Sequence, residues 1–421
     1  MKHLSFLQSI LVLFGLMIFV QSCSFDECKE TRRYVYYRPV YKTIEQIRDI
    51  KTQSPEALKN PGKIYVYGDY LFVNEINKGI HVFDNSDINN PVNISFISIL
   101  GNVDLAIKDN ILYADNFFDL ISIDITDPKN PHFVNSVKEI FNKIYGSNRK
   151  YVVEYIPTDT SVVIDCSNQY WGYQYYEKDG GVYVSNDNLG GNSTSWNPPP
   201  NPNGVGGSMA RFTIYKNRLY TINKSKINVF NITNPPVPYL TNTVNVGWGI
   251  ETLFPYKNNL LIGSSTGMYV YDLKDPNTPT FQFQFRHGKA CDPVYALGDY
   301  AYVTLRTGTR CGGDINQLDV LDIKDLKHPI LIKSYQMSNP QGLGVIGDKM
   351  ILCEGTFGLK VLDIKDKKNI TVQSKIESGD FFDVIPLSED DIIVVGKTGL
   401  YQYKLENYQL KELSLIPIAV E

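Results

Sequence analysis

The sequence predicts an all-β fold, a seven-bladed β-propeller of four-stranded antiparallel blades, and three observations support this prediction. A short pattern recurs, in which alternating apolar residues lead to an acid or amide and then to a turn; its copies include "KGIHVFDNSDINNPVNI", "TGMYVYDLKDPNTPTF" and "FGLKVLDIKDKKNITV". The copies follow one another at a nearly constant spacing. Apolar residues alternate with a period of two between turn residues, which is typical of antiparallel strands and not of helices.

The spacing of the copies defines a structural unit. Each copy closes at one position, and these positions are Asp84, Asp124, Asn231, Asp272, Asp322, Asp363 and Lys404. The gaps between them are 40, 107, 41, 50, 41 and 41 residues, so a unit of 41 residues carries one modest and one large insertion. An internal repeat of this length indicates a repeat architecture. The seven units begin near Gly62, Asn102, Met209, Gly249, Asp292, Gly342 and Asp380.

Each unit holds four short strands, as "GIETLFPYKNNLLIGSSTGMYVYDLKDPNTPTFQFQF" illustrates. Four such strands have two apolar faces that one unit cannot bury alone, so the units must stack on one another. A closed ring of units leaves only short, protected edges, which favours a propeller over an open solenoid. Eight blades are the alternative, with "YVVEYIPTDTSVVIDC" as a degenerate unit.

The N-terminus has the pattern of an export signal. The apolar run "ILVLFGLMIFV" follows Lys2 and ends before Gln21, Ser22 and Cys23. A short apolar run with small residues behind it is typical of a secretory signal peptide. A membrane-spanning helix is the alternative, and the run is at the short limit for one. The stretch "FVQSC" resembles a bacterial lipoprotein box, which implies an acylated Cys23.

We therefore expect a signal peptide at 1–22, a lipid anchor and tether at 23–61, and the propeller at 62–421. The tether contains one candidate for a short helix, "TIEQIRDI". The propeller carries a long insertion at 138–208, whose second half is rich in Gly, Asn, Ser and Pro. Such a composition predicts a surface excursion with little core of its own.

Charge and potential ligand residues exclude some functions. A net charge of −4 and a pI near 5.8 leave no basic surface for nucleic acid. The five His have no metal-ligand spacing, so we expect no metal site and no cofactor. The acid that closes each copy is expected to cap the turn that follows it. A repeated calcium site is the alternative, although each copy supplies a single acid.

Six cysteines in an exported chain suggest disulfides. Cys291 and Cys311 flank a predicted hairpin and form the candidate bridge. Cys353 lies in the apolar strand "KMILC", where we expect it to be a small buried side chain.

The repeats also point to a family. "GIHVFD", "GMYVYDL", "QLDVLDI" and "GLKVLDI" resemble the LVIVD repeat, and "VGWGIETLFP" and "AYVTLRTGTRC" are similar to stretches of Bacteroidetes propeller lipoproteins that carry it. The resemblance implies the propeller fold and an outer-membrane lipoprotein, and it implies no established activity. "SFDE" after Cys23 is similar to the acidic export tag of surface-exposed lipoproteins, which implies the cell surface; a periplasm-facing protein is the alternative.

In a propeller, the loops that lead into the first strands and the loops that join second and third strands form one rim. Charged and aromatic residues gather in these segments of the sequence: Asp104, Arg211, Trp248, Glu251, His287, Asp292, Arg306, Gln341 and Asp383. They are our candidate binding residues. Each also has a structural interpretation, because Arg211 or Arg306 can neutralise Asp104 or Glu251 near a narrow channel.

We expect a non-enzymatic binding or scaffold protein whose rim engages an envelope protein or a glycan. The alternative is an enzyme that acts on polysaccharide or peptidoglycan, for which Glu251 and Asp292 would have to face each other across the channel mouth. No residue is assigned a catalytic role, because no catalytic motif stands out.

Overall fold

The computed structural model describes residues 29–141, 146–147, 150–165, 175–178, 181–185, 210–223, 225–247, 249–264, 267–286, 294–307 and 315–419. They form two compact units. The described parts of 1–42 and 152–199 make up one unit, and those of 43–151 and 200–421 make up the other.

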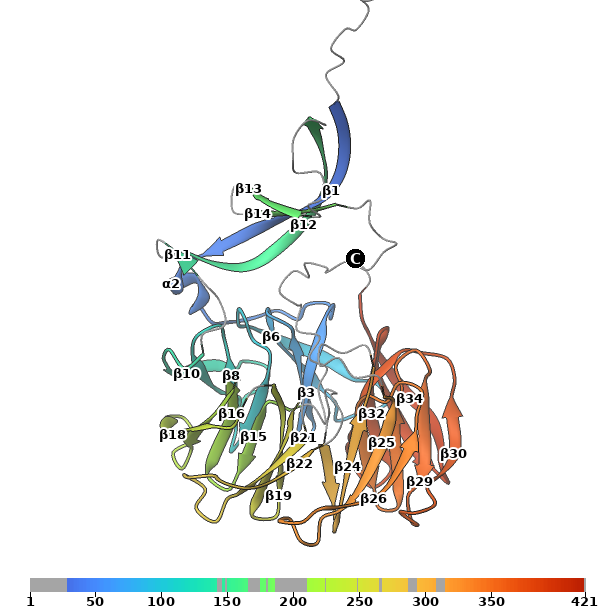
Figure 1. The fold of residues 1–421 in the computed structure, drawn as a ribbon. Helices are drawn as coiled ribbons and strands as arrows, with labels where there is room; N and C mark the ends of the chain where they lie inside the picture. Colours follow the sequence, from blue (N-terminus) through green and yellow to red (C-terminus); the bar gives the residue numbers. More distant parts are fainter. Residues whose placement is uncertain are drawn as a thin grey trace, which may run out of the picture. The chain divides into compact units, whose positions relative to one another are not determined.

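The larger unit is the predicted all-β propeller. Its described residues form seven antiparallel sheets that follow one another along the chain, each with four consecutive strands in spatial order (Figure 1). The first strands of consecutive blades contact one another from β3 through β31, so they form the inner ring. The fourth strands form the outer edges. The prediction of seven four-stranded blades is confirmed.

The strands of the first four blades have these bounds. Blade one contains β3 (Pro61–Tyr67), β4 (Tyr70–Glu75), β5 (Gly79–Asp84) and β6 (Val92–Ser98), and blade two contains β7 (Leu105–Lys108), β8 (Ile111–Asp115), β9 (Leu120–Asp124) and β10 (His132–Val137). Blade three contains β15 (Phe212–Tyr215), β16 (Arg218–Asn223), β17 (Lys226–Asn231) and β18 (Tyr239–Asn245), and blade four contains β19 (Ile250–Tyr256), β20 (Asn259–Ser264), β21 (Gly267–Asp272) and β22 (Thr280–Arg286).

The last three blades are built in the same way. Blade five contains β23 (Val294–Leu297), β24 (Tyr300–Leu305), β25 (Gln317–Asp322) and β26 (Ile330–Gln336). Blade six contains β27 (Leu343–Ile346), β28 (Lys349–Cys353), β29 (Leu359–Asp363) and β30 (Thr371–Ile376), and blade seven contains β31 (Phe381–Pro386), β32 (Asp391–Gly396), β33 (Gly399–Glu406) and β34 (Gln409–Pro417).

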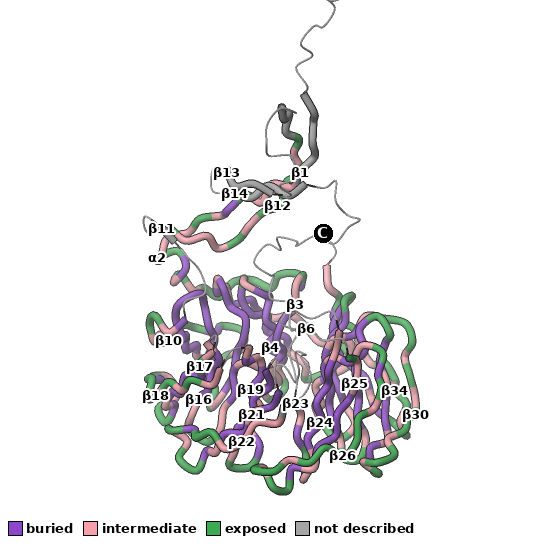
Figure 2. The backbone as a smooth tube through the Cα atoms, viewed as in Figure 1, coloured by how far each residue is buried: buried purple, intermediate pink, exposed green. Residues whose placement is uncertain are grey.

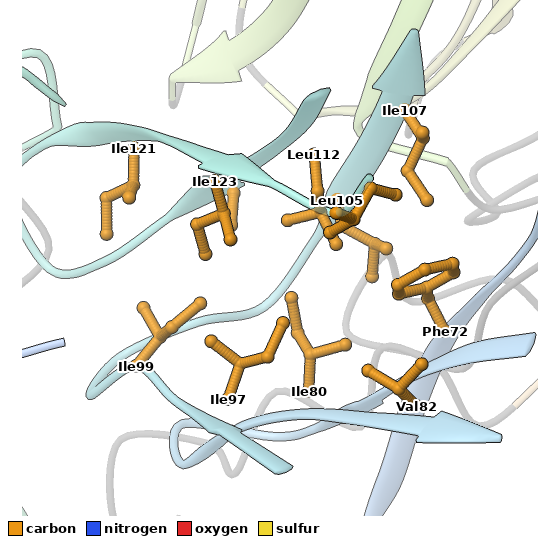
Figure 3. Packing of buried hydrophobic residues seen from close by; sticks show 12 residues of the cluster. Phe72, Ile80, Val82, Ile97, Ile99, Leu105, Ile107, Leu112, Ile121 and Ile123 are labelled. Atoms are coloured by element: carbon orange, nitrogen blue, oxygen red, sulfur yellow. The ribbon is translucent and has the colours of Figure 1, made fainter. Parts of the chain in front are cut away.

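The hydrophobic core lies between blades, as stacking requires. Figure 3 shows Phe72, Ile80 and Ile97 of blade one facing Leu105 and Leu112 of blade two, all of them buried. Equivalent clusters form between other neighbouring blades. Buried residues are concentrated in the inner strands, and exposed residues lie at the turns and outer edges (Figure 2). Cys353 is fully buried, as expected, and burial raises the pKa of its thiol.

The closing acids cap turns, as predicted. The side-chain oxygen of Asp124 accepts the backbone N–H of Thr126 at 2.7 Å, and that of Asp272 accepts the N–H of Lys274 at 2.6 Å. The same bond forms at Asp84, Asn231, Asp322 and Asp363. The repeated motif thus builds one turn six times over.

The ring closes between blade seven and blade one without exchange of a strand. Gln402 and Asn85 exchange two amide hydrogen bonds, at 2.7 and 3.0 Å, and Ser414 Oγ donates to the carbonyl of Ile88 at 2.7 Å. Leu71 and Val73 pack with Ile393 and other residues of blade seven in one buried cluster. Side-chain packing therefore joins the two ends.

The smaller unit is a second sheet that was not predicted from the sequence. Its strands follow in the order β12 (Lys150–Asp165), β1 (Lys29–Lys42), β14 (Gly181–Ser185) and β13 (Tyr175–Lys178). The two-residue β11 (Gly146–Ser147) pairs with the first two residues of β12, which precede this unit. β1 comes from the predicted tether, and the other strands come from the predicted insertion. The alternative of an eighth blade is wrong, because residues 151–165 of that stretch lie in β12 of this sheet. β1 and β14 are separated by more than a hundred residues, so no local sequence pattern predicts that they pair.

A segment after β1 belongs to the propeller unit. The short helix α2 (Ile44–Ile47) lies in the predicted stretch and begins with a capping box between Thr43 and Gln46. Arg48 then forms two hydrogen bonds with the buried Asp119 of blade two, at 2.7 and 3.1 Å. β2 (Lys51–Gln53) adds a fifth strand to blade one beside β6. No helix in the described residues is long and apolar enough to cross a membrane.

Candidate functional site

The propeller has two rims with different chemistry. We call the loops that lead into first strands and the loops that join second and third strands the loop rim. The loops that join first with second strands and third with fourth strands are the turn rim. The predicted binding residues belong to the loop rim.

Three of the nine predicted residues lie outside the described residues, and these are Trp248, His287 and Asp292. Cys23, Cys291 and Cys311 lie outside them as well, so the lipidation site and the candidate disulfide stay predictions. The remaining six are Asp104, Arg211, Glu251, Arg306, Gln341 and Asp383. Glu251 and Arg306 are half-buried, and each takes part in interactions within the protein.

Asp104 is buried and holds two neighbouring blades together. Its Oδ2 accepts the backbone N–H groups of Arg211 and Phe212, at 2.5 and 3.0 Å, where the chain enters blade three. The cation that faces it is Lys63 of blade one, with Nζ 3.9 Å from Oδ1. Burial raises the pKa of Asp104, against the opposing effect of Lys63. The sequence suggested the guanidinium of Arg211 as partner, whereas the observed contact uses its backbone.

Asp383 has an equally structural position. It is fully buried, and its Oδ1 accepts the N–H of Val384 at 2.9 Å. A Cβ on Gly342 of blade six would lie 2.0 Å from this oxygen, so only glycine fits there. Asp383 thus fixes how closely blades six and seven approach each other.

Three buried acids that the sequence did not single out stand at or just after the end of a second strand. Glu75 accepts the N–H groups of Lys59 and Asn60, at 3.0 and 2.7 Å. Asp115 Oδ1 accepts the N–H groups of Val103 and Asp104, at 2.8 and 3.1 Å. Glu354 Oε1 accepts the N–H of Ser338 at 2.7 Å. Each carboxylate holds the loop that leads into its own blade. The sequence offered one signal for predicting these residues, which is an acid at the same position in three units.

Two of these acids are also paired with a base six residues later. His81 Nε2 lies 3.1 Å from Glu75 Oε2, and Lys360 Nζ lies 2.5 Å from Glu354 Oε2. Burial alone would raise the pKa of Glu75, but the hydrogen bonds from His81 and from the two backbone N–H groups lower it below its ordinary value. These carboxylates are committed to the fold and have little capacity left for a ligand.

Polar groups of another kind gather around Gly355, in the loop between β28 and β29. An ideal Cβ on Gly355 would lie 2.4 Å from Gln341 Nε2, 2.8 Å from Asn339 Nδ2 and 3.5 Å from Asp380 Oδ1. The three side chains are half-buried and converge on one point of the loop rim. Within the described residues, the side-chain amides of Asn339 and Gln341 and the carboxylate of Asp380 have no hydrogen-bonding partner. Gln341 is thus a predicted binding residue whose side chain remains available to a ligand.

The same loop presents an aromatic ring to solvent. Phe357 is 60% exposed, and it is held by a tight turn in which its N–H donates to the carbonyl of Glu354 at 3.1 Å. Gly355 and Gly358 close this turn with φ values of +57° and +89°, a region that favours glycine. The ion pair between Glu354 and Lys360 joins the two ends of this loop. We call Asn339, Gln341, Phe357 and Asp380 the blade-six cluster.

The blade-six cluster offers recognition chemistry. Two amides can donate and accept hydrogen bonds, a carboxylate accepts them, and a phenyl ring supplies an apolar platform. In the described residues no group of three or more His, Cys, Asp or Glu could hold a metal ion.

No protein-family profile and no curated protein matches the chain. The computationally designed Ika8 protein superposes with a TM-score of 0.52 at 11% identity, over 85% of this chain and 88% of that one. A protein from Lactobacillus plantarum superposes with a TM-score of 0.51 at 10% identity, over 83% and 96% of the two chains. BamB from Moraxella catarrhalis covers 87% and 97% at 9% identity, but its TM-score of 0.48 is too low to carry an argument. At these identities the likeness supports the propeller fold alone.

Proposed function

We propose that the protein is a non-enzymatic binding lipoprotein of the bacterial cell envelope, and that its loop rim binds a glycan. Anchoring rests on the lipoprotein-box pattern at Cys23. The outer membrane and its outward face rest on the resemblance of the repeats to LVIVD lipoproteins and on the acidic residues after Cys23.

The blade-six cluster is the observation that carries the binding proposal. Sugars present apolar ring faces beside many hydroxyl groups, so they fit an exposed aromatic ring flanked by amides and a carboxylate. The described rim acids Glu75, Asp104 and Asp115 lack this character, because backbone N–H groups already occupy their oxygens. A protein partner is the competing ligand for the same cluster.

A glycan array followed by titration calorimetry with the full chain tests this proposal. We expect Phe357→Ala to weaken binding of the array hit by about fivefold or more, since an aromatic contact of this kind contributes on the order of 1 kcal/mol or more. Tyr239→Ala is the matched control, because Tyr239 is 57% exposed but lies at the start of β18, next to the turn rim.

Three outcomes would overturn the proposal. Equal losses in the two variants would mean that the cluster is not the site. An array without hits, together with a protein captured from envelopes by wild type and not by Phe357→Ala, would replace the glycan with a protein partner. Turnover of the glycan by the purified chain would instead favour the enzyme that we set aside, with Glu251 and Asp292 as the residues to substitute first.

A further inference from the structure

Asp380 of the blade-six cluster is a carboxylate without a counter-charge. Its side chain is half-buried, and within the described residues it forms neither a hydrogen bond nor an ion pair. Glu354, in the same pair of blades, differs in this respect, because its Oε2 lies 2.5 Å from Lys360 Nζ. Taking a carboxylate partly out of water without a partner is unfavourable. A bound cation would therefore stabilise Asp380.

Two side-chain amides surround the same point as this carboxylate. Gln341 Nε2 and Asn339 Nδ2 lie 2.4 and 2.8 Å from the position that a Cβ on Gly355 would take, and Asp380 Oδ1 lies 3.5 Å from it. Half a turn about its terminal bond exchanges the nitrogen and the oxygen of an amide, so Asn339 and Gln341 can each present an oxygen here. Three oxygens, one of them charged, complement an ammonium group, which has three donors and no acceptor.

The exposed ring of Phe357 favours the same kind of ligand. The face of an aromatic ring attracts a cation as well as the apolar face of a sugar. An acidic sugar would instead bring a second negative charge close to Asp380, which is unfavourable. The cluster thus discriminates between glycans by their charge.

We propose that the glycan bound by the blade-six cluster is an amino sugar, with its protonated amine on Asp380, Asn339 and Gln341 and its ring against Phe357. This inference rests on the proposed function, because it takes the ligand to be a glycan. Asp380 is then the residue that determines specificity.

The other charges near Asp380 leave this assignment in place. Lys397 donates its backbone N–H to the carbonyl of Asp380 at 2.8 Å, but its exposed ammonium forms no ion pair with the carboxylate. Glu377 is also exposed, and its Oε1 lies 3.9 Å from Lys375 Nζ. Exposed charges are weakened by water and salt, whereas a half-buried carboxylate acts at close range.

Three ligands that differ only at C2 of each sugar test the proposal. Short β-1,4-linked oligomers of glucosamine, N-acetylglucosamine and glucose carry an amine, an acetamide and a hydroxyl at this position. Calorimetry with the full chain, at a pH at which the amine is protonated, should show the glucosamine oligomer binding at least about tenfold more tightly than the glucose oligomer.

Two variants then assign this preference to one carboxylate. Asp380→Asn keeps the shape of the side chain and the backbone bond to Lys397, and it should reduce the preference to less than about threefold without weakening the glucose oligomer. Glu377→Gln removes the same charge from an exposed position outside the cluster and should keep the preference.

The inference is overturned, with glycan binding intact, if the glucose or N-acetylglucosamine oligomer binds as tightly as the glucosamine oligomer, or if the array hits carry no amine. Equal losses of preference in Asp380→Asn and Glu377→Gln would overturn it too. So would a lysine peptide that binds more tightly than the glucosamine oligomer and depends on Asp380, since the amine would then belong to a protein partner. Failure of all three oligomers together with an array without hits would reject the glycan-binding proposal itself.

Discussion

The two rims of the propeller are built from the same repeats, yet they have opposite character. On the turn rim one device recurs: the closing acid or amide of six blades caps the backbone two residues later. On the loop rim the equivalent positions differ from blade to blade. Blade one uses Glu75 with His81, blade six uses Glu354 with Lys360, and Asn223 of blade three donates to the carbonyl of Ile140 at 2.8 Å.

This difference separates the residues that build the ring from the residues that are specific to one blade. A residue type that recurs in every blade serves a need common to all blades, such as a turn. Polar residues that occur in one blade only serve a local need, and the blade-six cluster is a described example whose polar groups are not used by the fold. The loop rim is therefore where we place function.

Breaking a buried pair of the loop rim should have the largest effect on stability. Glu354→Ala removes the partner of Lys360, whose side chain is only 14% exposed and whose Nζ lies 2.5 Å from the carboxylate. We expect a loss of about 3–5 kcal/mol in the free energy of unfolding. Asp363→Ala, which removes a turn-rim cap in the same blade, should cost only about 1 kcal/mol. Guanidinium unfolding of both variants measures the two values, and equal losses would contradict the contrast between the rims.

The second loop-rim acid should show a characteristic pH dependence. The folded state lowers the pKa of Glu75, so the ionised carboxylate stabilises the fold above the unfolded pKa, and this contribution is lost as the pH falls through the folded pKa. We expect Glu75→Gln to cost about 2 kcal/mol at pH 7. The difference from wild type should be constant down to about pH 5.5 and should shrink below about pH 4.5. Urea unfolding across this range is the measurement, and a difference that grows on acidification would be the wrong sign.

The turn rim was predictable from the sequence and the loop rim largely was not. Asp272 and its equivalents recur at fixed spacing beside Gly, Asn and Pro, and a turn cap depends on residues two positions apart. Glu75 and Asp104 also recur as acids near strand ends, but their partners are backbone groups of loops or of another blade. The pairing of β1 with β14 joins residues such as Tyr36 and Tyr183, so no local window contains it.

The blade-six cluster was predictable in part. Gln341 stands at a strand start, where polar residues are unusual, and it was among the predicted residues. Asn339, Phe357 and Asp380 come from three different loops, and only the packing of blade six against blade seven brings them together. Phe357 in "GTFGLK" gave one usable signal, an aromatic residue between two glycines in a turn.

Removing a contact between one blade and a turn of the next blade should have an intermediate effect on stability. Tyr220 of blade three is buried, and its hydroxyl donates to the carbonyl of Pro276 in blade four at 2.7 Å. Tyr220→Phe keeps the ring but leaves this carbonyl without its donor, so we expect a loss of about 1 kcal/mol. Thermal unfolding followed by circular dichroism measures it. A loss as large as that of Glu354→Ala would mean that the turn rim is no more tolerant than the loop rim.

The smallest effect should come from replacing a closing aspartate by asparagine, which blade three already has at this position. Asn231 occupies the closing position of blade three, and its Oδ1 accepts the N–H of Thr233 at 2.8 Å as an aspartate would. Asp363→Asn should therefore change stability by less than about 0.5 kcal/mol. Asp363→Ala in the same assay is the matched comparison. A large loss for the amide would show that charge, and not the turn geometry, is what the repeat preserves.

Hydrogen exchange of the full chain, with and without a saturating array-identified glycan, tests most directly the claim that function lies on the loop rim. We expect slower exchange in 338–342, 354–358 and 377–381, with exchange in the turns 84–91, 272–279 and 363–370 unchanged. Protection confined to those turns, with the blade-six loops exchanging as before, would contradict it.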